Sequence, residues 1–321
     1  MMAMRRAKPD TGAAPSPAGP SCSEVVVLSG KGGTGKTTVA AALIARAAAH
    51  GVRVLATDCD VDAANLHLLL HPETVSSEPF IGGDVAAVDT SSCTGCDACS
   101  DHCAFGAMAP DHQVSALSCE GCGVCVIVCP AGAVQLVPKE NGTVYRCETA
   151  YGPMVHARLH PGQGNSGKLV AEVRRSGREL ARRRGATLII SDGPPGLGCP
   201  VLSAVTGADL ALVVTEPSAS AHHDLLRTLA VCAHFAVPAV VAVNKADIYP
   251  GGVRLIESDC RERGVEVIGR MPFSREVAES TAQARPLEGK GPAAEAMGEL
   301  WRRVHGILCG PVPPGPRGAA H

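Results

Sequence analysis

Two blocks of four cysteines constrain what this chain can fold into more than any other feature of its sequence. Both blocks have the spacing Cys-x2-Cys-x2-Cys-x3-Cys, and the second lies 26 residues after the first. The eight thiols are Cys93, Cys96, Cys99, Cys103, Cys119, Cys122, Cys125 and Cys129. Each block is followed closely by a Gly-Ala pair, so the repeat extends beyond the cysteines. It predicts a segment that folds around metal rather than around apolar side chains.

Composition indicates the surroundings in which these thiols would bind metal. The chain has 321 residues, a formal net charge of −2 and 15 cysteines. No uninterrupted apolar run reaches the roughly 18 residues of a membrane span, and none follows the basic residues near the N-terminus as a secretory signal requires. We therefore expect a cytoplasmic protein without stable membrane insertion, where clustered thiols serve as metal ligands. The near-zero net charge argues against nucleic acid as a partner.

The cysteine spacing also selects the metal. Three cysteines at intervals of three can bind three corners of a [4Fe–4S] cluster, and the fourth, four residues later, ligates the opposite cluster. One predicted cluster is held by Cys93, Cys96, Cys99 and Cys129, and the other by Cys119, Cys122, Cys125 and Cys103. Zinc, the alternative, needs only four thiolates, typically in two separated Cys-x2-Cys pairs. Pro130 follows the second block, as is usual for this pattern, but Ala104 follows the first. Because proline is not a ligand, this difference affects the expected turn after the first block and not the expected metal.

The segment 84–138 that contains both blocks resembles a bacterial-type ferredoxin domain with two clusters, and the resemblance implies electron transfer. Seven cysteines lie outside the blocks, and most of them are expected to be small core residues. Cys147 and Cys199 are left open because both lie close in sequence to motif segments.

A second constraint is a glycine-rich loop between a predicted strand at 24–28 and a predicted helix at 39–49. Glycines let backbone N–H groups turn toward phosphates, Lys36 can reach the β- and γ-oxygens, and the Thr37 hydroxyl can bind Mg²⁺. The context of strand, loop and helix therefore predicts a P-loop. The predicted nucleotide-binding residues of this loop are Gly32, Gly33, Thr34, Gly35, Lys36, Thr37 and Thr38.

A dinucleotide-binding turn is the competing interpretation of the same loop. Gly30-x-Gly32-x-x-Gly35 fits that fingerprint, and the acids Asp58 and Asp60 follow a second predicted strand at 52–56. A dinucleotide turn has no use for a Lys-Thr pair directed at a terminal phosphate and a metal ion. The pair Lys36-Thr37 therefore favours the P-loop.

The loop has a second lysine, Lys31, near its start, and so resembles the deviant Walker A motif of the MinD/ParA superfamily and the nitrogenase iron protein. In that group the early lysine crosses a nucleotide-sandwiched dimer to the partner's phosphates. The resemblance implies ATP and Mg²⁺ as cofactors, a homodimer, and catalytic roles for Lys31 and Lys36. Apart from its two tails, the chain resembles superfamily ATPases with an inserted two-cluster ferredoxin domain, relatives also of the Mrp-type ATPases.

Four further residues match motifs of this superfamily. Asp60, after the second predicted strand, resembles the first switch, which implies that it orients the attacking water. Asp192, at the end of a predicted strand at 187–191, resembles the Walker B acid that binds Mg²⁺, and Gly196 would offer its N–H to the γ-phosphate. Asn244, after a predicted strand at 239–243, is similar to the residue that contacts the adenine base.

The spacing of predicted strands indicates the fold. Strands are expected at 24–28, 52–56, 187–191, 210–215, 239–243 and 265–268, with helix-compatible segments between them. This alternation predicts an α/β fold with a doubly wound, mostly parallel sheet and a small inserted α+β domain of ferredoxin type. The expected division is a disordered tail at 1–22, an ATPase domain at 23–83 and 139–308, the insert at 84–138, and a second tail at 309–321.

Three other segments carry weaker expectations. The Gly/Pro-rich segment 151–168 is expected to be a loop whose His156 and His160 are solvated, with roles as ligands or partner contacts as the alternatives. The helix predicted near 166–184 has an arginine-rich face that is expected to be solvated. A helix with apolar residues from 297 to 307 is expected to pack on the domain rather than bind a membrane.

Three hypotheses for function follow. The first is an ATP-hydrolysing redox protein whose nucleotide-gated dimer passes electrons through two clusters to a redox partner. The second is an iron–sulfur carrier whose ATPase cycle gates cluster delivery to an apo-protein acceptor. The third, a positioning protein with vestigial clusters, is disfavoured because no membrane helix is evident.

Overall fold

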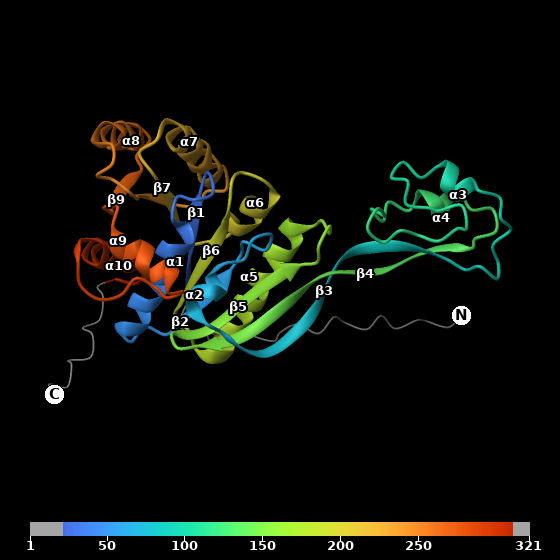
Figure 1. Cartoon of the computed structure of the whole chain (residues 1–321), viewed down its shortest axis with the longest axis horizontal. Coiled ribbons are helices and arrows are strands. Elements are labelled where there is room, and N and C mark those ends of the chain that lie inside the picture. Colours follow the sequence, from blue (N-terminus) through green and yellow to red (C-terminus); the bar gives the residue numbers. More distant parts are fainter. Residues whose placement is uncertain (1–21, 311–321) are drawn as a thin grey trace, which may run out of the picture.

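A single nine-stranded sheet forms the centre of the computed structural model, which describes residues 22–310 (Figure 1). In spatial order the strands are β3 (Glu73–Val88), β4 (Val134–Thr149), β5 (Gly152–Leu159), β2 (Val54–Asp58), β6 (Leu188–Pro195), β1 (Ser23–Ser29), β7 (Leu210–Thr215), β8 (Ala239–Val243) and β9 (Glu266–Arg270). From β5 to β9 the neighbouring strands pair in parallel, whereas β3, β4 and β5 pair antiparallel. The predicted doubly wound, mostly parallel fold is confirmed.

Helices cover both faces of the parallel part of the sheet. One face packs against α1 (Lys36–Ala49), α2 (Leu66–Leu70), α9 (Arg275–Ala282) and α10 (Pro292–Cys309), and the other against α5 (Ser166–Arg184), α6 (Cys199–Val205), α7 (Ala219–His234) and α8 (Pro250–Glu262). Side chains of β1 alternate between these layers, with Val25 and Val27 on the α1 side and Val26 and Leu28 on the α5 side. A strand buried on both faces in this way reads as a continuous apolar run.

The C-terminal helix α10 packs on the domain, as the sequence predicts. Met297, Leu300, Trp301 and Val304 are buried in the same cluster as the apolar residues of α1, and Trp301 is fully buried. Ile307, the last residue of the predicted stripe, is about half exposed. The tails predicted at 1–22 and 309–321 lie almost entirely outside the described residues.

Two expectations about the middle of the chain are wrong. Residues 152–159 form strand β5 rather than a loop, and His156 is only 6% exposed because it lies in the sheet between β2 and β4. The basic face of α5 is not simply solvated, because Arg174 is only 5% exposed. The arginine is buried because an acid, Glu24 of β1, is buried beside it.

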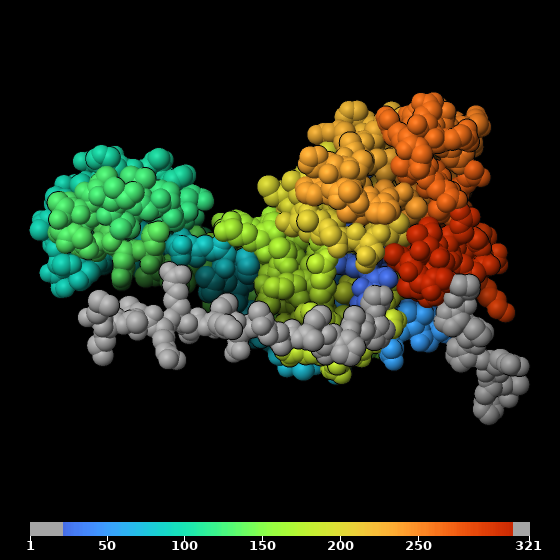
Figure 2. Space-filling model, turned by 180° about the vertical axis from the view of Figure 1, so that it is seen from behind, coloured from blue at the N-terminus to red at the C-terminus, as the bar shows by residue number. Residues whose placement is uncertain are grey.

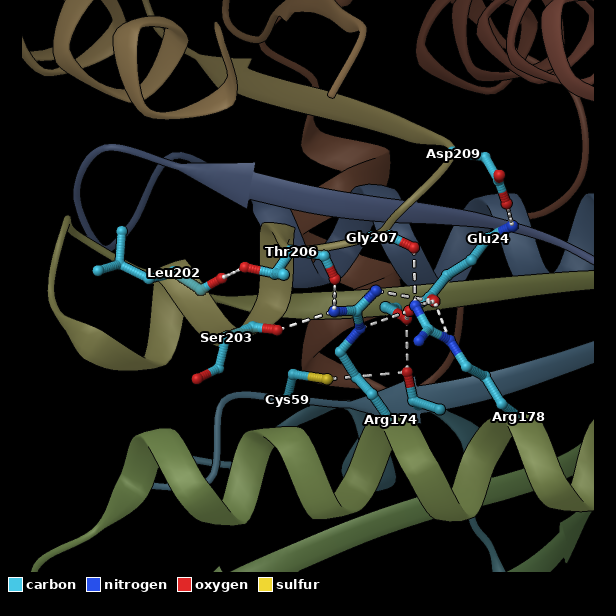
Figure 3. Close-up of polar contacts among 11 residues, drawn as sticks. Glu24, Cys59, Arg174, Arg178, Leu202, Ser203, Thr206, Gly207 and Asp209 are labelled. Carbon is cyan, nitrogen blue, oxygen red and sulfur yellow. Dashed lines mark hydrogen bonds and ion pairs between the residues drawn. The ribbon is translucent and has the colours of Figure 1, made fainter. Parts of the chain in front are cut away.

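Glu24 anchors α5 to the sheet through two arginines (Figure 3). Its carboxylate accepts hydrogen bonds from Arg174 Nε at 2.7 Å and Nη2 at 2.9 Å, and from Arg178 Nη2 at 2.7 Å. Arg174 Nη1 also donates to the carbonyl oxygens of Ser203 and Thr206, at the end of α6. Burial opposes ionisation, but the two arginines hold the pKa of Glu24 below its ordinary value. One buried acid thereby joins β1, α5 and α6.

Strands β3 and β4 leave the sheet as a two-stranded ribbon (Figure 1). They pair from Glu73 opposite Glu148 to Val88 opposite Val134, whereas β4 contacts β5 only from Gly142 onward. The outer part of the ribbon carries residues 89–133, which include the short helices α3 (Ala98–Asp101) and α4 (Val124–Val128). Figure 2 shows these residues as a protruding lobe, coloured teal to green. We call this segment the cysteine lobe.

Candidate functional site

The glycine-rich loop connects β1 to α1 at the carboxyl end of the parallel strands. Gly35 caps the helix with a φ of 92°, and a Cβ there would lie 2.4 Å from Asn244 Nδ2, so only glycine fits. Helix α1 begins at Lys36 with no side-chain cap among the described residues. Its first N–H groups are therefore available to an anion, and the helix dipole favours one there.

Lys36 lies at the centre of an acidic cluster. Its Nζ is 2.7 Å from Asp192 Oδ1 and 3.8 Å from Asp60 Oδ2, so the structure brings three predicted site residues together. Burial disfavours the ammonium, but Asp192, Asp60 and Asp58 outweigh it and raise the pKa of Lys36. For the carboxyl group of Asp60, burial disfavours the charged form and so raises the pKa, although Lys36 opposes the shift. A charged lysine therefore stays in place to meet phosphate.

Two buried oxygens of this site have no hydrogen-bond partner within residues 22–310. They are Thr34 Oγ1 in the loop and Asp192 Oδ2. Buried polar atoms are nearly always paired, so these two indicate missing partners. A carboxylate oxygen and nearby hydroxyls are the oxygen ligands that Mg²⁺ and its water shell prefer. The chemistry of the site thus fits a magnesium nucleotide, with Thr37 in the first turn of α1 as the predicted second ligand.

The sequence alone did not assign a role to Asp58 in this site. Asp58 is fully buried next to Asp192, and its two oxygens accept the backbone N–H groups of Asp60 and Leu66 at 3.1 and 3.0 Å. Burial and then the charge of Asp192 raise the pKa of Asp58 to about 8. Asp58 thereby fixes both ends of the segment that carries Asp60.

Glu216 is the other residue that the sequence did not single out. It follows β7, and its carboxylate lies 2.8 Å from Lys31 Nζ and 2.9 Å from Lys245 Nζ. Hydrogen bonds from Lys31 and Lys245 lower the pKa of Glu216 to about 2, although burial opposes the shift. An acid at the carboxyl end of a parallel strand beside a P-loop is the pattern by which Glu216 could have been found.

Two other residues that are predicted to contact the nucleotide, Gly196 and Asn244, form hydrogen bonds within the protein instead. The Gly196 N–H donates to the Ser29 carbonyl at 3.0 Å, so contact with a γ-phosphate requires that this bond break. Asn244 donates from Nδ2 to the Thr34 carbonyl at 2.8 Å, and its Oδ1 accepts the Lys245 N–H. Asn244 therefore lies against the P-loop, and its contact with an adenine base stays a prediction.

The cysteine lobe contains a small, partly open cavity of about 20 Å³. Among its lining residues are Cys103, Cys119, Cys122 and Cys125, the four thiols that the spacing assigns to one cluster. In the described part of the chain, no three Cys, His, Asp or Glu side chains converge closely enough to hold a single metal ion. These four thiols come from both cysteine blocks and line one common cavity, which is the arrangement that crossed ligation of a cluster requires.

The two halves of the lobe repeat each other in structure as well as in sequence. Cys103 Sγ accepts the Ala107 N–H at 3.3 Å, and Cys129 Sγ accepts the Ala133 N–H at the same distance. These and neighbouring backbone N–H groups lower the pKa of both thiols. Hydrogen bonds of this kind stabilise thiolates, the form in which cysteine ligates metal.

The two cysteines left open by the sequence differ in their surroundings. Cys147 is buried, and its Sγ lies 3.8 Å from Thr74 Oγ1. Burial raises the pKa of the Cys147 thiol, so it is an inert core residue. Cys199 is exposed at the start of α6.

His160 lies beyond the end of β5, where its Nε2 is 3.4 Å from Thr143 Oγ1.

This fold and site define a P-loop nucleotide-binding protein with helices on both faces of a parallel sheet. The sequence profile of the CobQ/CobB/MinD/ParA nucleotide binding domain matches residues 25–287. The chain belongs to that family, and it is an ATPase of the MinD/ParA type.

Relatives and solved structures agree with this assignment. An uncharacterised protein of Methanocaldococcus jannaschii is 32% identical over 222 residues, which cover 69% of this chain and 78% of that protein. An iron–sulfur cluster carrier protein of Pyrococcus horikoshii is 26% identical over 301 residues, or 88% and 85% of the two chains. The septum site-determining protein MinD of P. horikoshii, solved with Mg-ADP, shares the fold at a TM-score of 0.57 and 20% identity, covering 88% of this chain and 96% of that one. No helix within residues 22–310 is long and apolar enough to span a membrane.

Proposed function

We propose that this protein is an ATP-dependent iron–sulfur protein in which a nucleotide-gated homodimer cycle controls electron transfer through two [4Fe–4S] clusters of the cysteine lobe. The observation that carries the proposal is the cavity lined by Cys103, Cys119, Cys122 and Cys125. Cys93, Cys96, Cys99 and Cys129 would hold the second group. When bound, such clusters supply one-electron carriers.

The residues of the nucleotide site support the ATPase half of the proposal. Lys36 is fully positioned before phosphate arrives, because Asp192 and Asp60 hold its ammonium. Binding of a triphosphate would share Lys36 between carboxylate and phosphate oxygens, so that Asp192 becomes available to Mg²⁺. Asp60, at the end of a segment fixed by Asp58, would then orient the attacking water.

The path of the chain supports coupling between the two sites. Asp58 ends β2, whose neighbour β5 pairs with β4, and β4 runs on into the ribbon that carries the cysteine lobe. Asn141 braces the base of this ribbon: its Oδ1 accepts the Gly82 N–H at 3.1 Å and its Nδ2 donates to Gln163. A displacement at the nucleotide end of β2 would therefore reach the lobe through hydrogen-bonded strands.

The test is anaerobic reconstitution of the full chain, followed by chemical reduction and reoxidation with and without Mg-ATP. We expect about eight iron atoms per chain, reversible bleaching of the cluster absorbance, and a reduction rate that depends on nucleotide. The Lys36→Ala variant should keep the iron and lose the nucleotide effect. Protein that stays colourless after reconstitution would refute the proposal, as would clusters that cannot be reduced.

Cluster delivery to an apo-protein is the second candidate, and one observation favours it. The P. horikoshii relative that aligns over 88% of this chain is named an iron–sulfur cluster carrier protein. Mixing the loaded protein with an apo-ferredoxin distinguishes the two candidates. Electron transfer predicts that the iron stays on this chain, whereas ATP-dependent loss of iron to the acceptor would establish delivery.

A further inference from the structure

A pocket distinct from both sites lies where α2 faces β4 and β5. It is open to solvent, has a volume of about 460 Å³, and is lined by His67, His71, Pro72, Thr74, Tyr145, His156 and Arg158. The lining comprises three imidazoles, a guanidinium, a phenol and a hydroxyl, and no acidic residue is part of it. The pocket therefore offers hydrogen-bond donors and positive charge.

His156 is the buried residue of this pocket, only 6% exposed. Its ring stacks with that of Tyr145 at a centroid distance of 4.8 Å and with that of His67 at 5.5 Å. The Nδ1 atoms of both His156 and His67 are buried without a hydrogen-bond partner in residues 22–310. Two unpartnered imidazole nitrogens on stacked rings that line one pocket indicate a missing ligand.

Arg158 supplies the charge. Its Nη2 donates to His67 Nε2 at 2.8 Å, which leaves the proton of a neutral His67 on the orphaned Nδ1. Within the described chain, the guanidinium forms no ion pair with a carboxylate. Asp58 is the register partner of His156, but its two oxygens already accept the backbone N–H groups of Asp60 and Leu66. Within residues 22–310, no carboxylate therefore pairs with the exposed guanidinium of Arg158.

We propose that this pocket binds a small oxyanion of the phosphate type, either the free ion or the phosphate group of a phosphomonoester. Guanidinium groups bind such oxyanions through paired, charge-assisted hydrogen bonds. The imidazole N–H groups of His67 and His156 would supply further donors. A divalent metal ion is disfavoured, because the guanidinium of Arg158 lies against His67 and would repel a second cation. This inference is independent of the function proposed above.

The titration of the neighbouring imidazoles agrees with this assignment. Burial first, then the positive potential of His67 and Arg158, lower the pKa of His156 to about 4. Burial and Arg158 also lower the pKa of His67. Both rings are therefore neutral near pH 7. A bound anion would offset the positive potential of Arg158 around them.

The experiment uses the full chain with its P-loop saturated by the Mg complex of a non-hydrolysable ATP analogue, so that the γ-phosphate position is also filled and phosphate cannot bind there. Inorganic phosphate and glycerol phosphate are titrated separately by calorimetry, and the histidine ring nitrogens are followed by NMR. We expect saturable binding of phosphate, with shifts in the signals of His67 and His156. Arg158→Gln should weaken binding about tenfold or more, while Arg275→Gln, whose side chain is 90% exposed on α9, should leave it unchanged.

The two titrations also separate the sources of the ligand. Binding of glycerol phosphate as well as phosphate indicates a phosphomonoester, and binding of phosphate alone indicates the free ion. The proposal is overturned if neither binds once the P-loop is filled, or if Arg158→Gln binds as tightly as the wild type. A zinc titration that saturates this pocket while phosphate does not would overturn it as well.

Discussion

The carboxylate of Glu216 lies 2.8 Å from the ammonium of Lys31 in the same chain. The lysine that is predicted to reach a partner's phosphates therefore forms an ion pair within its own subunit. Ser218 lies close to the same ammonium, at 3.5 Å. The carboxylate of Glu216 is shared with Lys245, which also lies 3.4 Å from the Gly33 carbonyl of the P-loop. This contact is a restraint that a dimer would have to release.

The first prediction concerns this restraint. Lys31→Ala should bind ATP within about twofold of the wild type but form no ATP-dependent dimer, because the group that crosses the interface is gone. Glu216→Gln should dimerise several-fold more readily, since it removes the charge that retains Lys31. Analytical ultracentrifugation with and without nucleotide measures both. Dimers of Lys31→Ala as tight as those of the wild type would contradict the assigned role.

The second prediction separates nucleotide binding from hydrolysis. Lys36→Ala should abolish measurable ATP binding, because it removes the buried ammonium that Asp192 holds in place to meet the phosphates. Asp60→Ala should keep the affinity within a few-fold and slow hydrolysis by about a hundredfold, as expected for loss of a water-orienting group. Equilibrium binding and phosphate release provide the two readouts. Unchanged hydrolysis by Asp60→Ala would show that its assigned role is wrong.

The third prediction tests the crossed ligation of the cysteine lobe. Cys103→Ser should remove the iron held with Cys119, Cys122 and Cys125, and Cys129→Ser the iron held with Cys93, Cys96 and Cys99. Each variant should therefore retain about half of the iron, and so should the double variant Cys103→Ser/Cys119→Ser, which uncrossed ligation would leave with almost none. Cys199→Ser is the matched control, because this exposed thiol lies outside the lobe. Complete loss of iron from the control would place the metal elsewhere.

The fourth prediction concerns the buried ion pair of Glu24 and Arg174. Glu24→Gln should cost about 3 kcal/mol of unfolding free energy, because it leaves Arg174 buried without a counter-charge. The pKa of Glu24 is lowered by folding, so its contribution is present above the unfolded value of 4.5 and is lost as the pH falls. Urea unfolding at pH 7 and pH 4 measures this. Glu299→Gln, at an exposed i,i+3 pair, should change little.

The fifth prediction uses the lowered pKa of His156. Folding lowers this pKa from 6.5 to about 4, so the contribution of His156 is full above pH 6.5 and declines as the pH falls toward 4. Between pH 7 and pH 5 the wild type should lose about 2 kcal/mol more than His156→Gln, in a phosphate-free buffer. His223→Gln, whose side chain is 72% exposed, should show the wild-type pH dependence. Equal pH slopes in all three would refute the assignment.

The sequence was sufficient for the parallel core and for the nucleotide loop. Buried strands such as β1 and β7 contain β-branched residues within short apolar runs, and Gly35 and Lys36 occupy fixed places in a local motif. Local patterns of this kind carry their own structural information, since neighbouring residues determine the conformation.

The features that the sequence did not predict depend on contacts between residues far apart in the chain. β3 is interrupted by Pro79, Gly82 and Gly83 and is mostly exposed over its first half, so no alternation marks it as a strand. Arg174 is buried only because Glu24 lies beside it, 150 residues earlier in the chain. The Lys31–Glu216 contact likewise joins two distant loops. Pairings at such separations leave no periodic trace in a sequence.

The ribbon that carries the cysteine lobe has a consequence for how the chain can be rebuilt. The expected boundaries of the insert, Asp84 and Pro138, are register partners, so the chain enters and leaves the lobe at one place. A tight turn joining them would excise the lobe and leave a plain hairpin. Because strand side chains alternate, deleting one cross-strand pair would turn the lobe to the opposite side. Deleting two would bring it about 7 Å nearer in its original orientation.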